Sequence, residues 1–257
     1  MNQKSYLDEF IKANAYNDIL NNFFYFLGQL PGSEVLERNT DDKEISLENG
    51  FKEYFSALTF EGSIRWNVSP YVEDNLGFFF VQSEELSERS SKKRQFELIK
   101  YVLKRQKFSL FNYAIFVFYD TKGNKRISFV EVSFVGGKRQ FSTYKRYTFF
   151  VSPELTNHTF KDQFQKLSFV APKQVKEVFS VEPVTRAFYN EIQNWYFWAL
   201  DKIFFPNDRG EKDDVHRATS LIRLLTRLIF IWFMKEKKLI PEHLFDPTFL
   251  ANVEKDF

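Results

Sequence analysis

The spacing of apolar residues changes several times along the chain. Apolar positions recur at helical spacing over residues 5–30, 50–58 and 87–106, which predicts three helices. Short apolar runs bounded by Gly, Asn, Asp and Ser predict strands between and after these helices. The expected strands are 63–69, 77–82 (GFFFVQ), 113–119 (YAIFVFY), 126–134 (RISFVEVSF) and 140–151.

After residue 153 helical spacing dominates. A mixed stretch, 153–178, precedes two long helical patterns over 185–205 and 216–238. The order of elements predicts an α/β (or α+β) fold, with a mixed sheet and flanking helices. We expect residues 1–152 to form this domain and residues 153–257 to form a mainly helical connector.

The net charge of +2, from 36 Lys and Arg against 34 Asp and Glu, conceals an uneven distribution. Residues 1–88 carry a net charge of −10, residues 89–146 carry +12, and the remainder is neutral. A basic segment of this kind attracts phosphate groups, so DNA is an expected partner through sequence-independent backbone contacts. The cations expected to contribute are Lys92, Lys93, Arg94, Lys100, Lys104, Arg105, Lys107, Lys138, Arg139, Lys145 and Arg146.

Several classes of protein are disfavoured by composition. The chain has no cysteine, which excludes disulfides and thiolate zinc sites, and its three histidines are scattered. The most apolar run, 221–234, is 14 residues long and contains two arginines, whereas a membrane span needs about 20 apolar residues. The N-terminus also lacks the apolar stretch of a signal peptide. We therefore expect a cytoplasmic protein with no membrane partner.

A metal-dependent nuclease is the enzyme class most worth testing. Its site needs an Asp near a strand end, then an acid two positions before a Lys on the next strand. Asp74 could act with Glu84 or Glu85, but no acid-x-Lys follows it. Asp120 could act with Glu131, but Ser133 stands where the lysine belongs. These five acids are the catalytic candidates, and Mg²⁺ is a candidate cofactor only if the domain is an active nuclease.

Two stretches in the helical part resemble the region that precedes the methyltransferase domain in type IIG-like restriction–modification enzymes. They are SVEPVTRAFYNEIQNWYFWAL (180–200) and TSLIRLLTRLIFIWFMKEKKLIPEHLF (219–245). Upstream, residues 112–120, 126–134 and 145–164 are similar to the N-terminal part of the same enzymes. The likeness covers 110–257 well and 1–110 loosely, and rests on apolar and arginine positions.

The resemblance implies a bacterial chain that fuses an endonuclease, or its remnant, to an adenine-specific DNA methyltransferase and a target-recognition domain. This stretch would supply a degenerate, restriction-nuclease-like domain that contacts DNA and supports the downstream domains, which would be its partners. S-adenosylmethionine would bind only downstream, because the family's glycine loop and Asn-Pro-Pro-aromatic motif do not occur here. We expect no cofactor and no activity of this fragment alone.

Two alternatives to that function stay open. One is an active Mg²⁺-dependent endonuclease whose site has been rearranged among the five acids. The other is a protein-interaction module that binds no nucleic acid, in which the basic helix contacts an acidic partner or residues 1–88. The long apolar pattern of 216–238 also predicts a helix buried on several sides, so further polypeptide is expected to cover it.

Overall fold

The computed structural model describes residues 3–69, 72–88, 92–136, 138–142, 147–180, 182–205 and 214–236, with a few positions between 239 and 248. The chain divides into two compact units, Met1–Val184 and Thr185–Phe257. We call the first the sheet unit and the second the helical unit.

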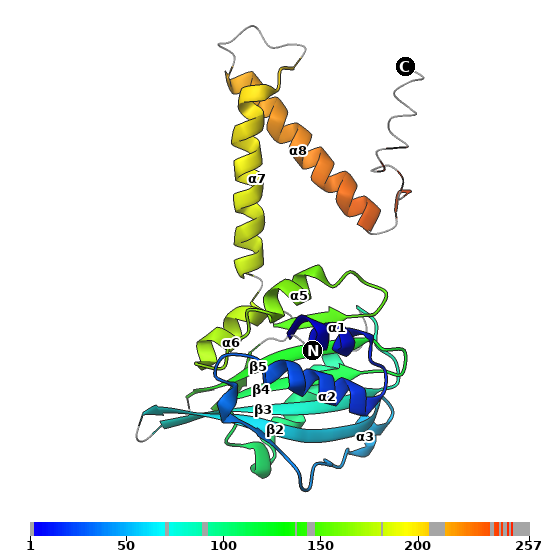
Figure 1. Cartoon of the computed structure of the whole chain (residues 1–257), viewed down its shortest axis with the longest axis vertical. Helices are drawn as coiled ribbons and strands as arrows, with labels where there is room; N and C mark the ends of the chain where they lie inside the picture. Colours follow the sequence, from blue (N-terminus) through cyan, green and yellow to red (C-terminus); the bar gives the residue numbers. More distant parts are fainter. Residues whose placement is uncertain are drawn as a thin grey trace. The chain divides into compact units, whose positions relative to one another are not determined.

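The sheet unit is built on a mixed sheet to which the described residues contribute seven strands (Figure 1). Six strands lie in the order β1-β2-β3-β4-β5-β6, and β7 pairs with the first half of β5. Neighbouring strands are antiparallel except β3 and β4, which are parallel. The strands are β1 (Leu36–Arg38), β2 (Phe55–Ser69), β3 (Val72–Ser83), β4 (Tyr113–Tyr119), β5 (Lys125–Val135), β6 (Lys138–Phe141) and β7 (Thr148–Val151).

Helices cover both faces of this sheet, which confirms the predicted mixed sheet with flanking helices. One face packs against α1 (Gln3–Lys12), α2 (Tyr16–Leu27), α5 (His158–Phe164) and α6 (Pro172–Phe179), as Figure 1 shows. The opposite face packs against α4 (Lys92–Lys104) and residues of the short α3 (Asn49–Lys52). Two single-turn 3-10 helices, Ser33–Val35 and Gln106–Phe108, lie in the connections.

The α4 helix forms the crossover between the parallel neighbours β3 and β4. Parallel strands cannot be joined by a tight turn, so the chain must cross one face of the sheet between them. Alternation along β3 directs Phe79 and Val81 towards α4 and Phe78 and Phe80 towards α1 and α2. The α4 residues that face the sheet are Gln95, Leu98, Ile99, Val102 and Leu103.

Phenylalanine fills the space on both sides of the sheet. On the α2 side, the Phe23 ring meets those of Phe78 and Phe80 edge-on, at centroid distances of 6.4 and 5.6 Å. On the α4 side, the rings of Phe79 and Phe116 stack at 4.6 Å. Offset and edge-on ring pairs add about 1 kcal/mol each to the energy of burial. The high phenylalanine content is therefore largely explained by the core.

Some predicted boundaries differ from the structure. The helix expected over 5–30 is two helices, and the one expected over 50–58 ends at Lys52, because Phe55 and Leu58 are buried in β2. The strand expected over 140–151 is divided into β6 and β7, which pair with different parts of β5. The long β2 and β3 extend beyond the predicted strands, and β4 has the predicted bounds.

The sheet unit extends further than we expected. We placed the end of the first domain at residue 152, whereas the compact unit continues to Val184. The reason is that α5 and α6 complete the core over one face of the sheet. The Phe164 ring, fully buried, lies within about 6 Å of the rings of Phe23, Phe26 and Phe179.

The helical unit contains α8 (Asp214–Glu236) and, from Thr185 onward, α7 (Glu182–Lys202). Ala199 and Leu221 are fully buried, while a hollow of about 510 Å³ with a mainly apolar lining lies between the two helices further along. Many aromatic and aliphatic side chains of both helices remain exposed. These exposed residues include Phe188, Tyr189, Phe197, Trp198, Ile222, Phe230, Trp232 and Phe233. None of the described helices has the combined length and apolar character needed to span a bilayer.

We expect Phe164→Ala to lower the free energy of unfolding by about 3–5 kcal/mol, as for other buried phenylalanines replaced by alanine. Urea denaturation followed by far-UV circular dichroism measures this change. The exposed Lys166→Ala in the same stretch is the matched control, with an expected change within about 0.5 kcal/mol. Equal stability of the two variants would show that α5 is not part of the core.

Candidate functional site

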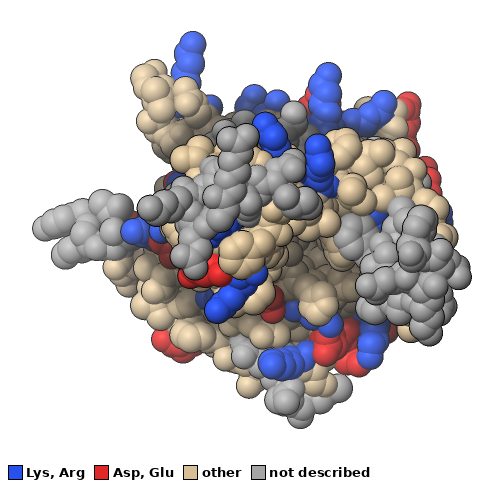
Figure 2. Space-filling view, turned by 90° about the horizontal axis from the view of Figure 1, so that it is seen from above, with Lys and Arg blue, Asp and Glu red and all other residues tan. Residues whose placement is uncertain are grey.

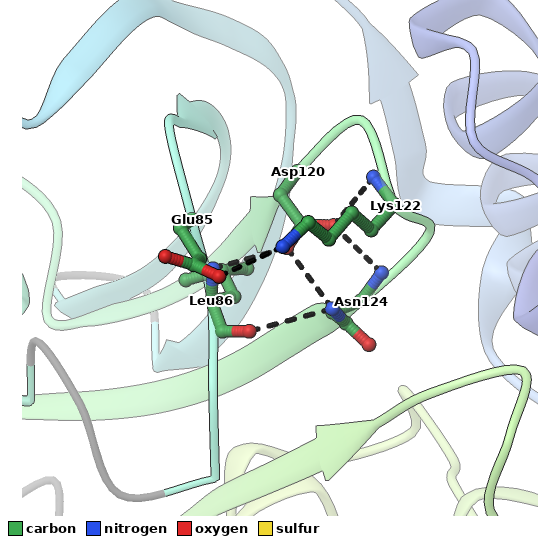
Figure 3. Close-up of polar contacts among 5 residues, drawn as sticks. All are labelled: Glu85, Leu86, Asp120, Lys122 and Asn124. Carbon is green, nitrogen blue, oxygen red and sulfur yellow. Dashed lines mark hydrogen bonds and ion pairs between the residues drawn. The ribbon is translucent and has the colours of Figure 1, made fainter.

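Asp120, a candidate catalytic acid, is fully buried in the turn between β4 and β5. Its Oδ1 accepts hydrogen bonds from the backbone N–H groups of Lys122 and Asn124, at 3.0 and 2.8 Å. Its Oδ2 accepts from the Leu86 N–H and from Asn124 Nδ2, both at 3.0 Å (Figure 3). Four donors thus converge on one carboxylate, which holds the turn closed and fixes the segment at Leu86 beside it.

Lys125, the first residue of β5, is also fully buried. Its Nζ donates to the carbonyl oxygens of Ile11, Ala13 and Gly123, at 3.0, 2.6 and 2.6 Å. Ile11 and Ala13 lie at the C-terminal end of α1, just before α2. The last carbonyl groups of a helix have no hydrogen-bond partner within the helix. The ammonium group satisfies them at the point where the helix predicted over 5–30 is interrupted.

Arg126 connects the same turn to the opposite layer. This fully buried side chain donates from Nη1 to Gln95 Oε1 of α4 at 2.7 Å. Its Nη2 donates to the carbonyl oxygens of Ser87 and Glu88, at 2.7 and 3.1 Å. The turn between β4 and β5 is therefore a junction of buried charges that touches both helical layers. Its residues are engaged in holding the fold.

The register of the sheet separates both pairs of acids that the sequence suggested. Asp74 lies near the start of β3 and Glu84 follows its end, so about 30 Å of extended strand lies between them. In the β4–β5 pair, Glu131 stands opposite Tyr113, at the far end of β4 from Asp120, which is about 20 Å away. Glu85 is exposed and pairs with Lys122 at 2.8 Å. Neither expected pair can share one metal ion.

The structure instead brings Asp74 and Glu131 towards one another across β3, β4 and β5. Burial and the charge of Glu131 raise the pKa of Asp74 above its ordinary value. Burial, Asp74 and Glu131 together raise the pKa of Tyr113, on the strand between them, to about 12. Lys176 of α6 binds Glu131 at 2.7 Å. Two carboxylates, a lysine and a phenol thus lie at one end of the sheet.

This group, which we call the Asp74–Glu131 cluster, does not fit a magnesium ion. A hard cation of this kind is held by several oxygen ligands, and in the described part of the chain no three Asp, Glu or His side chains are placed to share an ion. Lys176 already neutralises one of the two carboxylates. The cluster contains the residue types of a nuclease site in an arrangement that favours an ion pair.

Sequence reasoning missed another buried acid, Glu61 of β2. This residue lies at a register shift in the β2–β3 pair, between Phe60 and Gly62, and is completely buried. Its Oε1 accepts a very short hydrogen bond from the Tyr16 hydroxyl, and its Oε2 pairs with Lys43 Nζ at 3.1 Å. Burial and Glu61 raise the pKa of Tyr16. Glu61 stood in a stretch that we expected to lie outside the strand, so no local pattern indicated its burial.

The basic α4 helix presents three stripes of side chains. One faces the core, and a second (Arg94 and Tyr101, continued by Arg105 just after the helix) lies against the segment 42–54. Arg105 donates to the Ser46 carbonyl at 2.7 Å. Beyond the helix, Lys107 pairs with Asp42 at 2.6 Å, which lowers the pKa of that carboxyl. Part of the acidic N-terminal segment therefore neutralises the C-terminal end of the basic helix.

The third stripe faces solvent and carries most of the remaining charge. Lys93, Glu97, Lys100 and Lys104 follow one another at spacings of three and four residues, which places them on one side of the helix. No ion pair joins Lys93, Lys100 or Lys104 to another residue in the ranges that the structure describes. Glu97 is the one acid in the stripe, so its net charge is positive.

The β6 strand continues this surface past the end of α4. Arg139 donates to the Leu103 carbonyl of α4 and to the Ser109 carbonyl, the latter at 2.6 Å, which ties β6 to the helix. Lys138 beside it is exposed. Lys145 and Arg146 lie outside the described residues. On the face drawn in Figure 2, Lys and Arg side chains project separately, several of them beside Asp or Glu.

Comparisons with protein-family models, with curated proteins and with solved structures found no match to this chain.

We expect Asp120→Ala to lower the free energy of unfolding by about 3 kcal/mol, because buried backbone N–H groups would lose a charged acceptor. Chemical denaturation measures the effect. Glu85→Ala, which removes an exposed ion pair with Lys122 of the same turn, is the control, with an expected change under about 1 kcal/mol. An unchanged stability of Asp120→Ala would contradict the structural role of this acid.

Because of Lys125, the free energy of unfolding is expected to change with pH in the alkaline range. Burial lowers the pKa of Lys125 to about 8, so the folded chain releases this proton before the unfolded chain does. The unfolded state then binds more protons between about pH 8 and pH 10, and the free energy of unfolding should rise with pH there. Urea denaturation at several pH values tests this, with Lys125→Met as the comparison. An equal rise in the variant would assign the effect to another group.

Proposed function

We propose that the sheet unit contacts the phosphate backbone of DNA through the solvent-facing stripe of α4, without cutting it. The observation that carries the proposal is the positive stripe formed by Lys93, Lys100 and Lys104, which has no described ion-pair partner. Cations at helical spacing can each approach a phosphate and release condensed counterions. Lys138, held beside the helix by the Arg139 contacts, extends the same surface.

A scaffolding role accounts for the candidate acids better than a nuclease role does. Asp120 has its oxygens filled by four donors, Glu131 is paired with Lys176, and Glu84 is exposed at the other end of β3 from Asp74. A nuclease needs carboxylates that converge on a metal and on an attacking water. The arrangement supports a degenerate nuclease-like domain, in agreement with what the resemblance implies.

The proposal places this stretch at the N-terminus of a type IIG-like restriction–modification enzyme in the bacterial cytoplasm. The downstream methyltransferase and target-recognition domains of the same chain would be its partners, and S-adenosylmethionine would bind there. The exposed aromatic residues of α7 and α8, and the apolar hollow between these helices, suit contact with such domains. The sheet unit itself needs no cofactor for this role.

Duplex binding by the chain should fall when the stripe is neutralised. We expect the variant that combines Lys93→Ala, Lys100→Ala and Lys104→Ala to bind duplex DNA more weakly. The slope of log affinity against log salt concentration should become less steep by about 3. Fluorescence anisotropy between about 50 and 200 mM salt measures both quantities. The matched control removes three exposed lysines of the other layer, Lys12, Lys166 and Lys173.

Other outcomes would replace this proposal. Equal weakening in the control and stripe variants would mean that only total charge matters, and no binding at low salt would favour the protein-interaction module. Plasmid incubated with the chain, Mg²⁺ and S-adenosylmethionine should remain intact. Cleavage that is lost in Asp74→Asn or Glu131→Gln would establish the rearranged endonuclease instead.

A further inference from the structure

Aromatic rings and cations alternate along the seam between α3 and α4. The Arg94 guanidinium lies 3.4 Å from the centre of the Tyr54 ring, a stacked arrangement. About two helical turns further along α4, the Phe51 and Tyr101 rings are 5.1 Å apart, and the Arg105 guanidinium lies 4.5 Å from the centre of the Tyr101 ring. Surfaces that bind single-stranded nucleic acids combine positive charge with aromatic rings on which bases stack.

A hollow opens at the Tyr54 end of this seam. It has a volume of about 370 Å³, within the range of small-ligand sites, and residues of α3 and α4 form its sides. Lys93 also belongs to the solvent-facing stripe, so the hollow adjoins the surface proposed to contact phosphates. Its lining includes Glu53, Tyr54, Lys93, Arg94 and Glu97.

We propose that this hollow receives an unpaired nucleobase, so that the α4 surface binds single-stranded DNA more tightly than duplex DNA. The proposal rests on the DNA contact proposed above and adds the form of DNA that is preferred. The Arg94 plane, supported by the Tyr54 ring, offers a flat surface on which a base can stack. Lys93 lies where it can approach the phosphate of the same nucleotide.

The two carboxylates of the hollow give it a chemical preference. Glu53 and Glu97 are exposed acceptors, and acceptors of this kind bind the exocyclic amino groups of cytosine and adenine. They would repel a phosphate, which restricts the phosphate to the Lys93 side. A base inside a duplex is stacked on its neighbours and paired, so it cannot enter the hollow without an energetic cost.

The test compares one fluorescently labelled single strand with the blunt duplex of the same sequence, by anisotropy at one salt concentration. The unaltered chain should bind the single strand about tenfold more tightly, the scale of a single stacked base. Tyr54→Leu and Arg94→Lys should each abolish this ratio, since the first removes the supporting ring and the second removes the flat guanidinium. Tyr54→Phe, which keeps the ring, should preserve the ratio.

The outcomes separate this inference from the proposed function. Equal affinity of the unaltered chain for both forms, with binding that still depends on the α4 lysines, would overturn the hollow and leave the backbone contact standing. A single-strand preference that survives in Arg94→Lys would also overturn it. If the unaltered chain binds neither form of DNA at low salt, both the nucleobase site and the proposed backbone contact are overturned. Because Arg94 is exposed, its replacement by lysine keeps the fold intact.

Discussion

The interior of the sheet unit contains three charged side chains at one turn, and much of the fold depends on how they are satisfied. Charged groups are costly to bury unless hydrogen bonds replace the lost water. Asp120, Lys125 and Arg126 obtain those bonds from the backbone of the α1–α2 junction, from residues 86–88 and from α4. Both helical layers are thereby held in register with the β4–β5 turn, in addition to the non-directional packing of phenylalanine rings.

This junction also determines which polar residues remain available for function. Asp120 is occupied, and the acidic segment around Asp42 and Ser46 covers the C-terminal end of α4 through Lys107 and Arg105. The polar surface that stays available for a partner includes the outward side of α4 and its seam with α3. The proposed contact with DNA is thus confined to part of the segment whose net charge is +12, and the Asp74–Glu131 cluster lies on the opposite face of the sheet.

Local sequence patterns predicted the element types well, and they were least informative where distant residues decide the outcome. The β4 strand was predictable because YAIFVFY is a short apolar run bounded by Asn112 and Asp120, and Gly123 in the following turn adopts a positive φ of 86°. The break between α1 and α2 was not predictable, because the group that satisfies the backbone carbonyls there is Lys125, more than 110 residues away. The regrouping of Asp74 with Glu131 follows from the register of three strands. A Lys-Arg pair at a strand start gives no local sign that both side chains are buried.

The α4 helix serves at once as the connection between parallel strands and as the proposed surface for a partner. Its inward positions are constrained by volume and by the Gln95 contact with Arg126, whereas its outward positions have no part in the core. Charge on the outward side can therefore change in evolution at little cost to folding. A chain of this architecture could gain or lose affinity for polyanions through a few surface substitutions, while the helix that carries them stays fixed by topology.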